Sequence, residues 1–208
     1  MATSARQLAT PAEKKALAVF KRRSGMMRLA EALRAGVSRG TLERMLEKGT
    51  LERLSRGLYR LVDAEPLPNP DLAVVAAKVP DGVICLISAL SFHELTTQIP
   101  HEVYVAVSRT SEPPRIAHPP IRSFRFSGAA FSEGVEKHRL GPMTVRVYSR
   151  EKTLADCFKY RNRIGLDTCL EAVRFYKRQK KYNVDALLHF AKVCRVAKVI
   201  QPYLESIL

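Results

Sequence analysis

The sequence contains no hydrophobic run long enough to cross a membrane. Its longest apolar stretch, residues 82–90, has nine residues, whereas a transmembrane helix needs about 20. The first fifteen residues, MATSARQLATPAEKK, lack the apolar core of a secretory signal peptide. We therefore expect a cytoplasmic protein with no membrane partner.

Cysteine motifs that bind metals or support redox chemistry are also missing. The four cysteines are widely spaced and none forms a C-x-x-C pair. Isolated cysteines in a chain of this length behave as small hydrophobic residues. The sequence predicts reduced core thiols and no cofactor or metal. These cysteines are Cys85, Cys157, Cys169 and Cys194.

Familiar catalytic motifs are absent. The segment His93–Thr97, HELTT, begins like the zinc motif H-E-x-x-H but ends in threonine, so two imidazoles cannot meet one metal there. Glycine-rich phosphate loops and a G-x-S-x-G elbow are missing. Near the predicted strands, Glu102, Glu133 and Glu136 are available, but no Asp followed by E-x-K stands on successive strands to hold Mg²⁺. We expect a protein that is not an enzyme, with a metal-dependent nuclease as the catalytic alternative.

Acidic residues are few compared with basic ones. The chain has 35 Lys and Arg against 20 Asp and Glu, a net charge of +15. Residues 1–63 hold 14 basic and 6 acidic residues, and the other 145 hold 21 and 14. Such a balance favours polyanionic partners, and the first third is the denser source of positive charge.

Alternating prolines divide the chain. Pro66, Pro68 and Pro70 lie within DAEPLPNPD, and prolines at this spacing favour an extended, semi-rigid linker. We predict a helix-turn-helix domain with a wing at residues 10–63, a linker at 64–70 and a mixed domain at 71–208. The fold class is α/β (α+β), with a helical C-terminus.

The first domain is predicted to contain helices and one hairpin. Pro11 suits a first helical turn, Gly36 a helix end and Ser38 the N-cap of the next helix. Predicted helices cover residues 11–23, 26–36 and 39–48, and predicted strands 50–54 and 58–62 flank a three-residue loop, Ser55–Gly57, whose glycine takes a positive φ.

The second domain is predicted to mix strands and helices. Helices are expected at 69–79, 88–95, 150–162, 166–181 (with Asp167 as N-cap) and 183–194. Strands are expected at 102–108, 121–127, 136–140 and 143–149. Residues 82–88 are expected to form a buried strand or the start of a helix. An apolar stripe then runs through Val196, Val199, Ile200, Tyr203, Leu204 and Ile207. This stripe packs either inside the chain or against a second copy.

Helix, tight turn, helix and basic hairpin form the layout of a winged helix that binds double-stranded DNA. Burial of Leu42, Met45 and Leu46 is expected to turn the opposite face of their helix toward solvent, where its N-terminal part can meet base edges in a major groove. The hairpin would add arginines for phosphate or the minor groove. The predicted contact residues are Ser38, Arg39, Thr41, Arg44, Lys48, Arg53, Arg56 and Arg60.

Other uses of such a basic segment remain open. Similar layouts occur in RNA-associated and protein-binding modules, and a solvated basic surface is the purely structural alternative. Glu43 and Glu47 on the same helix count modestly against DNA, because they would lie near phosphates if they faced the groove.

Four segments resemble the AbiEi family of antitoxins from type IV toxin–antitoxin systems. They are LRAGVSRGTLERMLEKGTLERLSRGLYRL at 33–61, LISALSFHELT at 86–96, YSREKTLADCFKYRNRIGLDTCLEAVRFY at 148–176 and VCRVAKVIQPYLESIL at 193–208. The third is the most specific, since many regulators share a winged helix. Glu94 stands where family members often have glycine.

The resemblance implies a function that composition does not show. Such proteins repress their own operon through the winged helix, and their C-terminal domain counters a nucleotidyltransferase toxin without a stable complex. The family offers no established catalytic residues. The alternative within the regulator class is a ligand-responsive repressor unrelated to a toxin.

Overall fold

The computed structural model describes residues 9–207 and divides into two compact units. The first comprises Met1–Pro70 with Arg139–Met143, and the second Asp71–His138 with Thr144–Leu208. Residues 1–8, which form much of the stretch where no secretory signal is expected, lie outside the described residues.

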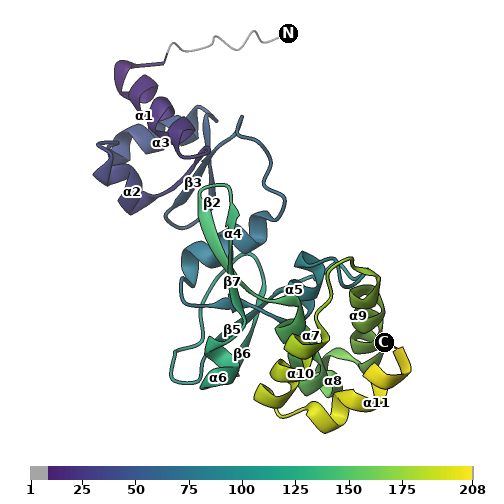
Figure 1. Ribbon diagram of the computed structural model, residues 1–208. Coiled ribbons are helices and arrows are strands. Elements are labelled where there is room, and N and C mark those ends of the chain that lie inside the picture. The colour runs from purple at the N-terminus through teal and green to yellow at the C-terminus, as the bar shows by residue number, and fades with distance from the viewer. Residues whose placement is uncertain (1–8, 208) are drawn as a thin grey trace. The chain divides into compact units, whose positions relative to one another are not determined.

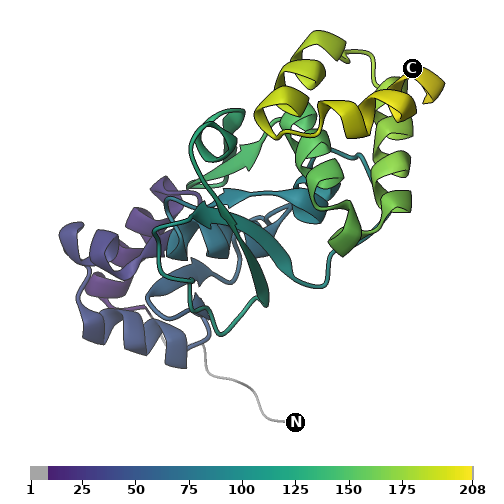
Figure 2. The same cartoon turned by 90° about the horizontal axis from the view of Figure 1, so that it is seen from below.

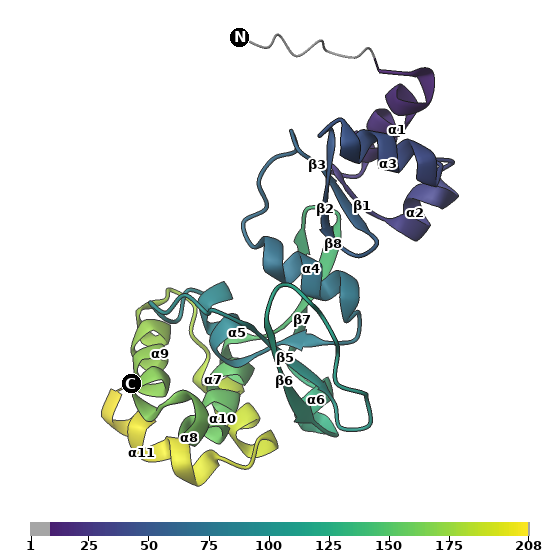
Figure 3. The ribbon, with the colours of Figure 1, turned by 180° about the vertical axis from the view of Figure 1, so that it is seen from behind.

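The first unit is a winged helix-turn-helix domain, as predicted. Its elements are α1 (Pro11–Arg22), β1 (Met26–Arg28), α2 (Leu29–Arg34), α3 (Arg39–Glu47), β2 (Leu51–Ser55) and β3 (Leu58–Leu61) (Figure 1). The strands form an antiparallel sheet in the order β1-β3-β2. The three helices gather beside this sheet (Figure 3).

Local capping sets the helix boundaries. Thr10 and Glu13 form a capping box at the start of α1, and Pro11 occupies its first turn. At the end of α2, Gly36 takes φ 81°, which allows the Val37 N–H to reach the Ala32 carbonyl at 2.9 Å. The chain therefore turns sharply into α3, as the sequence predicts.

Two details of the first unit differ from prediction. Residues 26–28 form β1 and not a helix, because Met26 pairs with Arg60 on a strand far along the chain. The wing loop contains two residues and not three, since Ser55 pairs with Leu58 across the hairpin. Gly57 has the expected positive φ, 77°, and this lets so short a loop close.

The second unit contains a five-stranded sheet in the order β6-β5-β4-β8-β7. Pairing is antiparallel for β4–β5 and parallel for β4–β8 and β5–β6. The strands are β4 (Val83–Ile84), β5 (Val103–Ser108), β6 (Ile121–Phe126), β7 (Val135–Leu140) and β8 (Met143–Tyr148). The predicted strands therefore form, and the chain after β4 continues directly into a helix.

Helices lie before, between and after these strands along the chain. They are α4 (Pro70–Lys78), α5 (Leu86–Phe92), α6 (Ala129–Ser132), α7 (Arg150–Lys159), α8 (Arg161–Ile164), α9 (Leu166–Arg178), α10 (Val184–Val193) and α11 (Ala197–Ile207). In Figure 2, α7 to α11, coloured green to yellow, gather at one end of this unit. Asp167 is not the N-cap of α9, because the helix already begins at Leu166 after Gly165.

The core of the second unit answers two questions that the sequence leaves open. Val196, Ile200 and Leu204 are buried within the cluster that also holds residues of α7 and α9, so the last apolar stripe packs inside the chain. All four cysteines are buried free thiols, as predicted, and burial raises the pKa of Cys85 and Cys157. No helix within residues 9–207 is long and apolar enough to span a bilayer.

Candidate nucleic-acid interface

Helix α3 packs one face into the core of the winged helix and exposes the other. Leu42 and Met45 are buried against residues of α1 and the sheet, whereas Leu46 is only partly covered. The exposed side of the helix carries Arg39, Gly40, Glu43, Arg44 and Glu47. This side is free to enter a groove about 12 Å wide.

The arginines of α3 flank its exposed face. At about 100° per residue, Glu43 and Glu47 lie near the middle of that face, with Arg39 and Arg44 on either side. Gly40 lies among them, and a Cβ added there would meet no atom within 4 Å. The face is therefore narrow and unobstructed, with positive charge at its edges.

Ser38 is the N-cap of α3, at the end of the helix that favours an anion. Its hydroxyl accepts the Thr41 N–H at 3.2 Å, which leaves other first-turn N–H groups directed out of the helix. These groups and the helix dipole favour a negative group at this end. Ser38 itself is exposed.

Thr41 does not face solvent, so its predicted orientation is wrong. The residue is only 4% exposed, and its hydroxyl lies 2.9 Å from that of Ser38. Position 41 falls on the same side of the helix as Met45 and completes the buried stripe. Thr41 supports the start of α3 and cannot reach a base.

The structure pairs Lys48 with a distant glutamate instead of leaving it among the outward cations. Its ammonium lies 2.9 Å and 3.0 Å from the two carboxylate oxygens of Glu13 on α1. Glu13 is 2% exposed, and the hydrogen bond from Lys48 lowers its pKa. Lys48 therefore joins α1 to the end of α3, and its charge is largely matched inside the domain.

Arg60, at the base of the wing, is also bound by groups of its own domain. It pairs with Glu52 at 2.7 Å and donates to the backbone carbonyls of Ala64 at 2.7 Å and Glu65 at 3.1 Å. Its side chain is 16% exposed. Arg60 fastens the hairpin to the segment that follows β3, a role that its position in LYRL does not reveal.

The wing presents two other arginines. Arg53 is exposed on β2, and its guanidinium lies 5.6 Å from the centre of the Tyr59 ring. Arg56 is exposed in the two-residue loop beside Gly57. Together with Ser38, Arg39 and Arg44, they form the remaining candidate interface.

Residues that the sequence offers for catalysis do not converge. Glu102 pairs with Arg122, Glu133 with His189 and Glu136 with His138. Across the described part of the chain, no cluster of three or more His, Cys, Asp and Glu side chains could hold a metal ion.

The most specific segment of the resemblance, around TLAD, contains a buried ion pair. Lys152 and Asp156 of α7 are both 0% exposed, with 2.6 Å between their charged atoms. The ammonium also lies 4.1 Å from the centre of the Tyr148 ring, and the Cys194 thiol donates to Asp156 at 3.2 Å. These side chains fix α7 within the core and are closed to a ligand.

A winged helix that exposes arginines on its third helix and wing has the architecture of a DNA-binding transcriptional regulator. Residues 14–62 match the model of a family described as "Transcriptional regulator, AbiEi antitoxin". The match supports the resemblance over the winged helix, the part of the chain that it covers.

A solved structure extends the similarity in fold beyond the first unit. The crystal structure of the RV2827C protein from Mycobacterium tuberculosis is similar, with a TM-score of 0.58 and 13% sequence identity. The similarity covers 97% of this chain and 83% of that one. At this identity it supports the fold alone. No curated protein matches the chain.

Proposed function

We propose that the protein represses its own operon by binding operator DNA through α3 and the wing. The observation that carries this proposal is the exposed face of α3, with Arg39 and Arg44 at its edges, in a domain that matches antitoxin-type regulators. In this proposal α3 enters the major groove, while Arg53 and Arg56 contact phosphates or the minor groove.

We further propose that the second unit, which contains most of residues 71–208, acts as the antitoxin part and is not an enzyme. Its segments 86–96, 148–176 and 193–208 carry the resemblance outside the winged helix. By that resemblance its functional partner is a nucleotidyltransferase toxin in the same cytoplasm, countered without a stable complex. This unit is compact in itself, which is consistent with a role separate from DNA binding by the winged helix.

Co-expression with the adjacent gene tests the antitoxin half. We expect that gene to inhibit growth alone and the full chain to restore growth, while the two proteins fail to co-purify. A matched chain with Arg39→Ala and Arg44→Ala should still restore growth but lose repression of a promoter reporter. A harmless neighbouring gene, or toxicity that the full chain does not relieve, contradicts the proposal.

A ligand-responsive repressor is the second candidate, and a pocket in the second unit favours it. This pocket has a volume of about 580 Å³ and includes Ile87, Tyr104 and Pro100 in its lining, a size within the usual range for small-molecule sites. In that case a metabolite extract would change operator affinity, and Tyr104→Ala would remove the response while leaving basal operator binding intact.

A further inference from the structure

A second cluster of positive charge lies at the end of α9 and in the loop that follows. No aspartate or glutamate occurs between Ala172 and Val184. The basic residues of this stretch are all exposed, and they are Arg174, Lys177, Arg178, Lys180 and Lys181. We call these five residues and Tyr182 the α9 patch.

Helix capping accounts for only part of this charge. Cations in a last turn stabilise the helix dipole, and the Lys177 ammonium binds the Ile207 carbonyl at 2.6 Å. Lys180 and Lys181, however, lie beyond the end of α9 at Arg178. Within residues 9–207 no carboxylate pairs with the four other cations of the patch. Their charge is therefore available to a partner.

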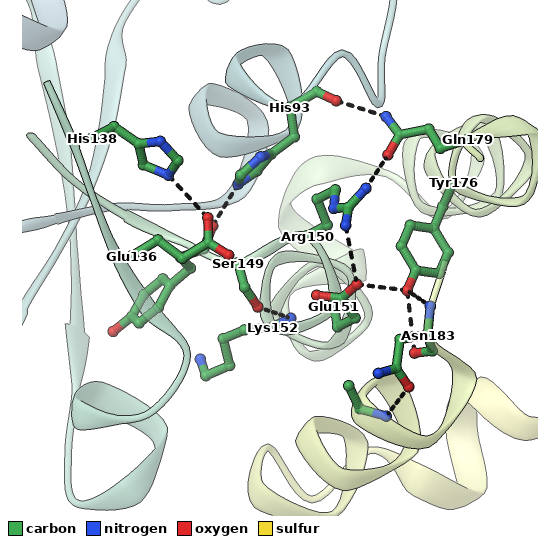
Figure 4. Close-up of polar contacts among 12 residues, drawn as sticks. His93, Glu136, His138, Ser149, Arg150, Glu151, Lys152, Tyr176, Gln179 and Asn183 are labelled. Carbon is green, nitrogen blue, oxygen red and sulfur yellow. Dashed lines mark hydrogen bonds and ion pairs between the residues drawn. The ribbon is translucent and has the colours of Figure 1, made fainter. Parts of the chain in front are cut away.

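The loop that carries the two lysines is fixed at both ends (Figure 4). At its start, the Gln179 amide donates to the His93 carbonyl at 2.9 Å and accepts from Arg150 at 2.9 Å. At its end, the Asn183 N–H donates to the Tyr176 hydroxyl at 2.6 Å. These bonds anchor the loop at both ends, which reduces the ordering of the backbone that binding through Lys180–Tyr182 requires.

An aromatic ring lies beside these lysines. Tyr182 is 49% exposed, and its ring makes an edge contact with the buried ring of Tyr176 at 6.2 Å between centres. The Tyr176 hydroxyl donates to Glu151 at 2.7 Å, which fixes the supporting ring. Tyr182 thus offers an accessible aromatic surface next to free cations.

We infer that the α9 patch binds single-stranded nucleic acid. Lysines and arginines attract the phosphodiester backbone, and an exposed tyrosine can stack on an unpaired base. A duplex would use the charges but not the ring, because its bases are already stacked. The inference is independent of operator binding, since it involves no residue of α3 or the wing.

Fluorescence anisotropy of the full chain tests the patch with three labelled probes: a 20-nucleotide RNA, the DNA strand of the same sequence and the corresponding DNA duplex. Tyr182→Ala should weaken single-strand binding roughly ten-fold, whereas Tyr182→Phe should keep it. A Lys180→Gln and Lys181→Gln double variant should make the salt slope shallower by about 1.4, at 0.7 per phosphate contact. The single strand that binds more tightly, RNA or DNA, identifies the kind of nucleic acid that the patch prefers. Either preference supports the inference.

A Lys192→Gln and Lys198→Gln variant removes the same charge from exposed positions outside the patch and should bind single strands as the unchanged chain does. Thermal unfolding checks that each variant is folded. Three results would overturn the inference: no single-strand binding at low salt, equal weakening by the two lysine pairs, or a Tyr182→Ala effect as large on the duplex as on the single strands. If operator binding fails while single strands still bind, only the proposed repressor function is lost.

Discussion

The salt dependence of operator binding should separate the arginines that contact DNA from the cations that hold the domain together. The outward set contains four arginines, Arg39, Arg44, Arg53 and Arg56. If each neutralises one phosphate, the slope of log K against log salt is about −3.6 per chain, because each contact contributes about 0.9. Between 50 and 200 mM salt these contacts alone then reduce affinity roughly 150-fold.

Single alanine variants measure the contribution of each arginine to the salt slope. Replacing any one of the four arginines should make the slope shallower by about 0.9. Lys48→Ala and Arg60→Ala are matched controls, because each removes one positive charge that is already paired with Glu13 or Glu52. We expect both controls to lower the thermal unfolding midpoint and to leave the slope unchanged.

The assay is fluorescence anisotropy on a labelled fragment from upstream of the gene, at five salt concentrations for each variant. Far-UV circular dichroism confirms folding. If Lys48→Ala or Arg60→Ala reduced the slope as much as Arg44→Ala, the assignment of those two residues to ion pairs within the domain would be refuted.

The remaining predictions concern both units. Ser38→Ala should lower the free energy of unfolding by about 1 kcal/mol, since it removes the cap of α3. Ser38→Asp should preserve stability but weaken operator binding. If the Ser38→Ala variant were as stable as the unchanged chain in urea unfolding, the capping role would be refuted. Gly40→Ala should stabilise α3 by about 0.5–1 kcal/mol and weaken operator binding through the added methyl group, as urea unfolding and anisotropy would show. Burial lowers the pKa of His93, so this side chain takes up a proton more readily in the unfolded chain, and the free energy of unfolding should fall as the pH drops through the usual range of histidine. The thermal unfolding midpoint of His93→Gln should therefore depend less on pH between 7.5 and 5.5. An unchanged pH dependence would exclude His93 as its source. Lys152→Met leaves the buried carboxylate of Asp156 unpaired and should cost about 3–5 kcal/mol, whereas an unchanged urea midpoint would show that the pair is not needed.

Local signals in the sequence predicted much of the fold. Capping residues and apolar periodicity located α1, α3 and most helices of the second unit, because these depend on neighbours within one or two turns. The four-residue helix α6 (Ala129–Ser132) was not predicted. The strand β1 was missed because Met26 also fits a helical stripe with Leu29, Ala30 and Leu33. Only the pairing of β1 with β3, between residues 30 to 34 positions apart, distinguishes a strand from a helix here.

The candidate site was predicted in outline, and two of its three errors, at Lys48 and Arg60, have one cause. The exposed arginines follow from helical periodicity, which places them opposite Leu42 and Met45. Lys48 and Arg60 were assigned to DNA because their partners are not visible in a local pattern. The Lys48 partner Glu13 lies 35 residues earlier, and the backbone carbonyls that bind Arg60 belong to the segment after the wing.

The central claim is that α3 and the wing read the operator, and a competition measurement tests it most directly. The full chain is titrated onto the fragment from upstream of its own gene and onto a shuffled duplex of equal length at 150 mM salt. We predict at least roughly 1,000-fold tighter binding to the upstream fragment, lost when Arg39 and Arg44 are both replaced by alanine. Equal affinity for the two duplexes, or a preference that survives the double replacement, would contradict the account.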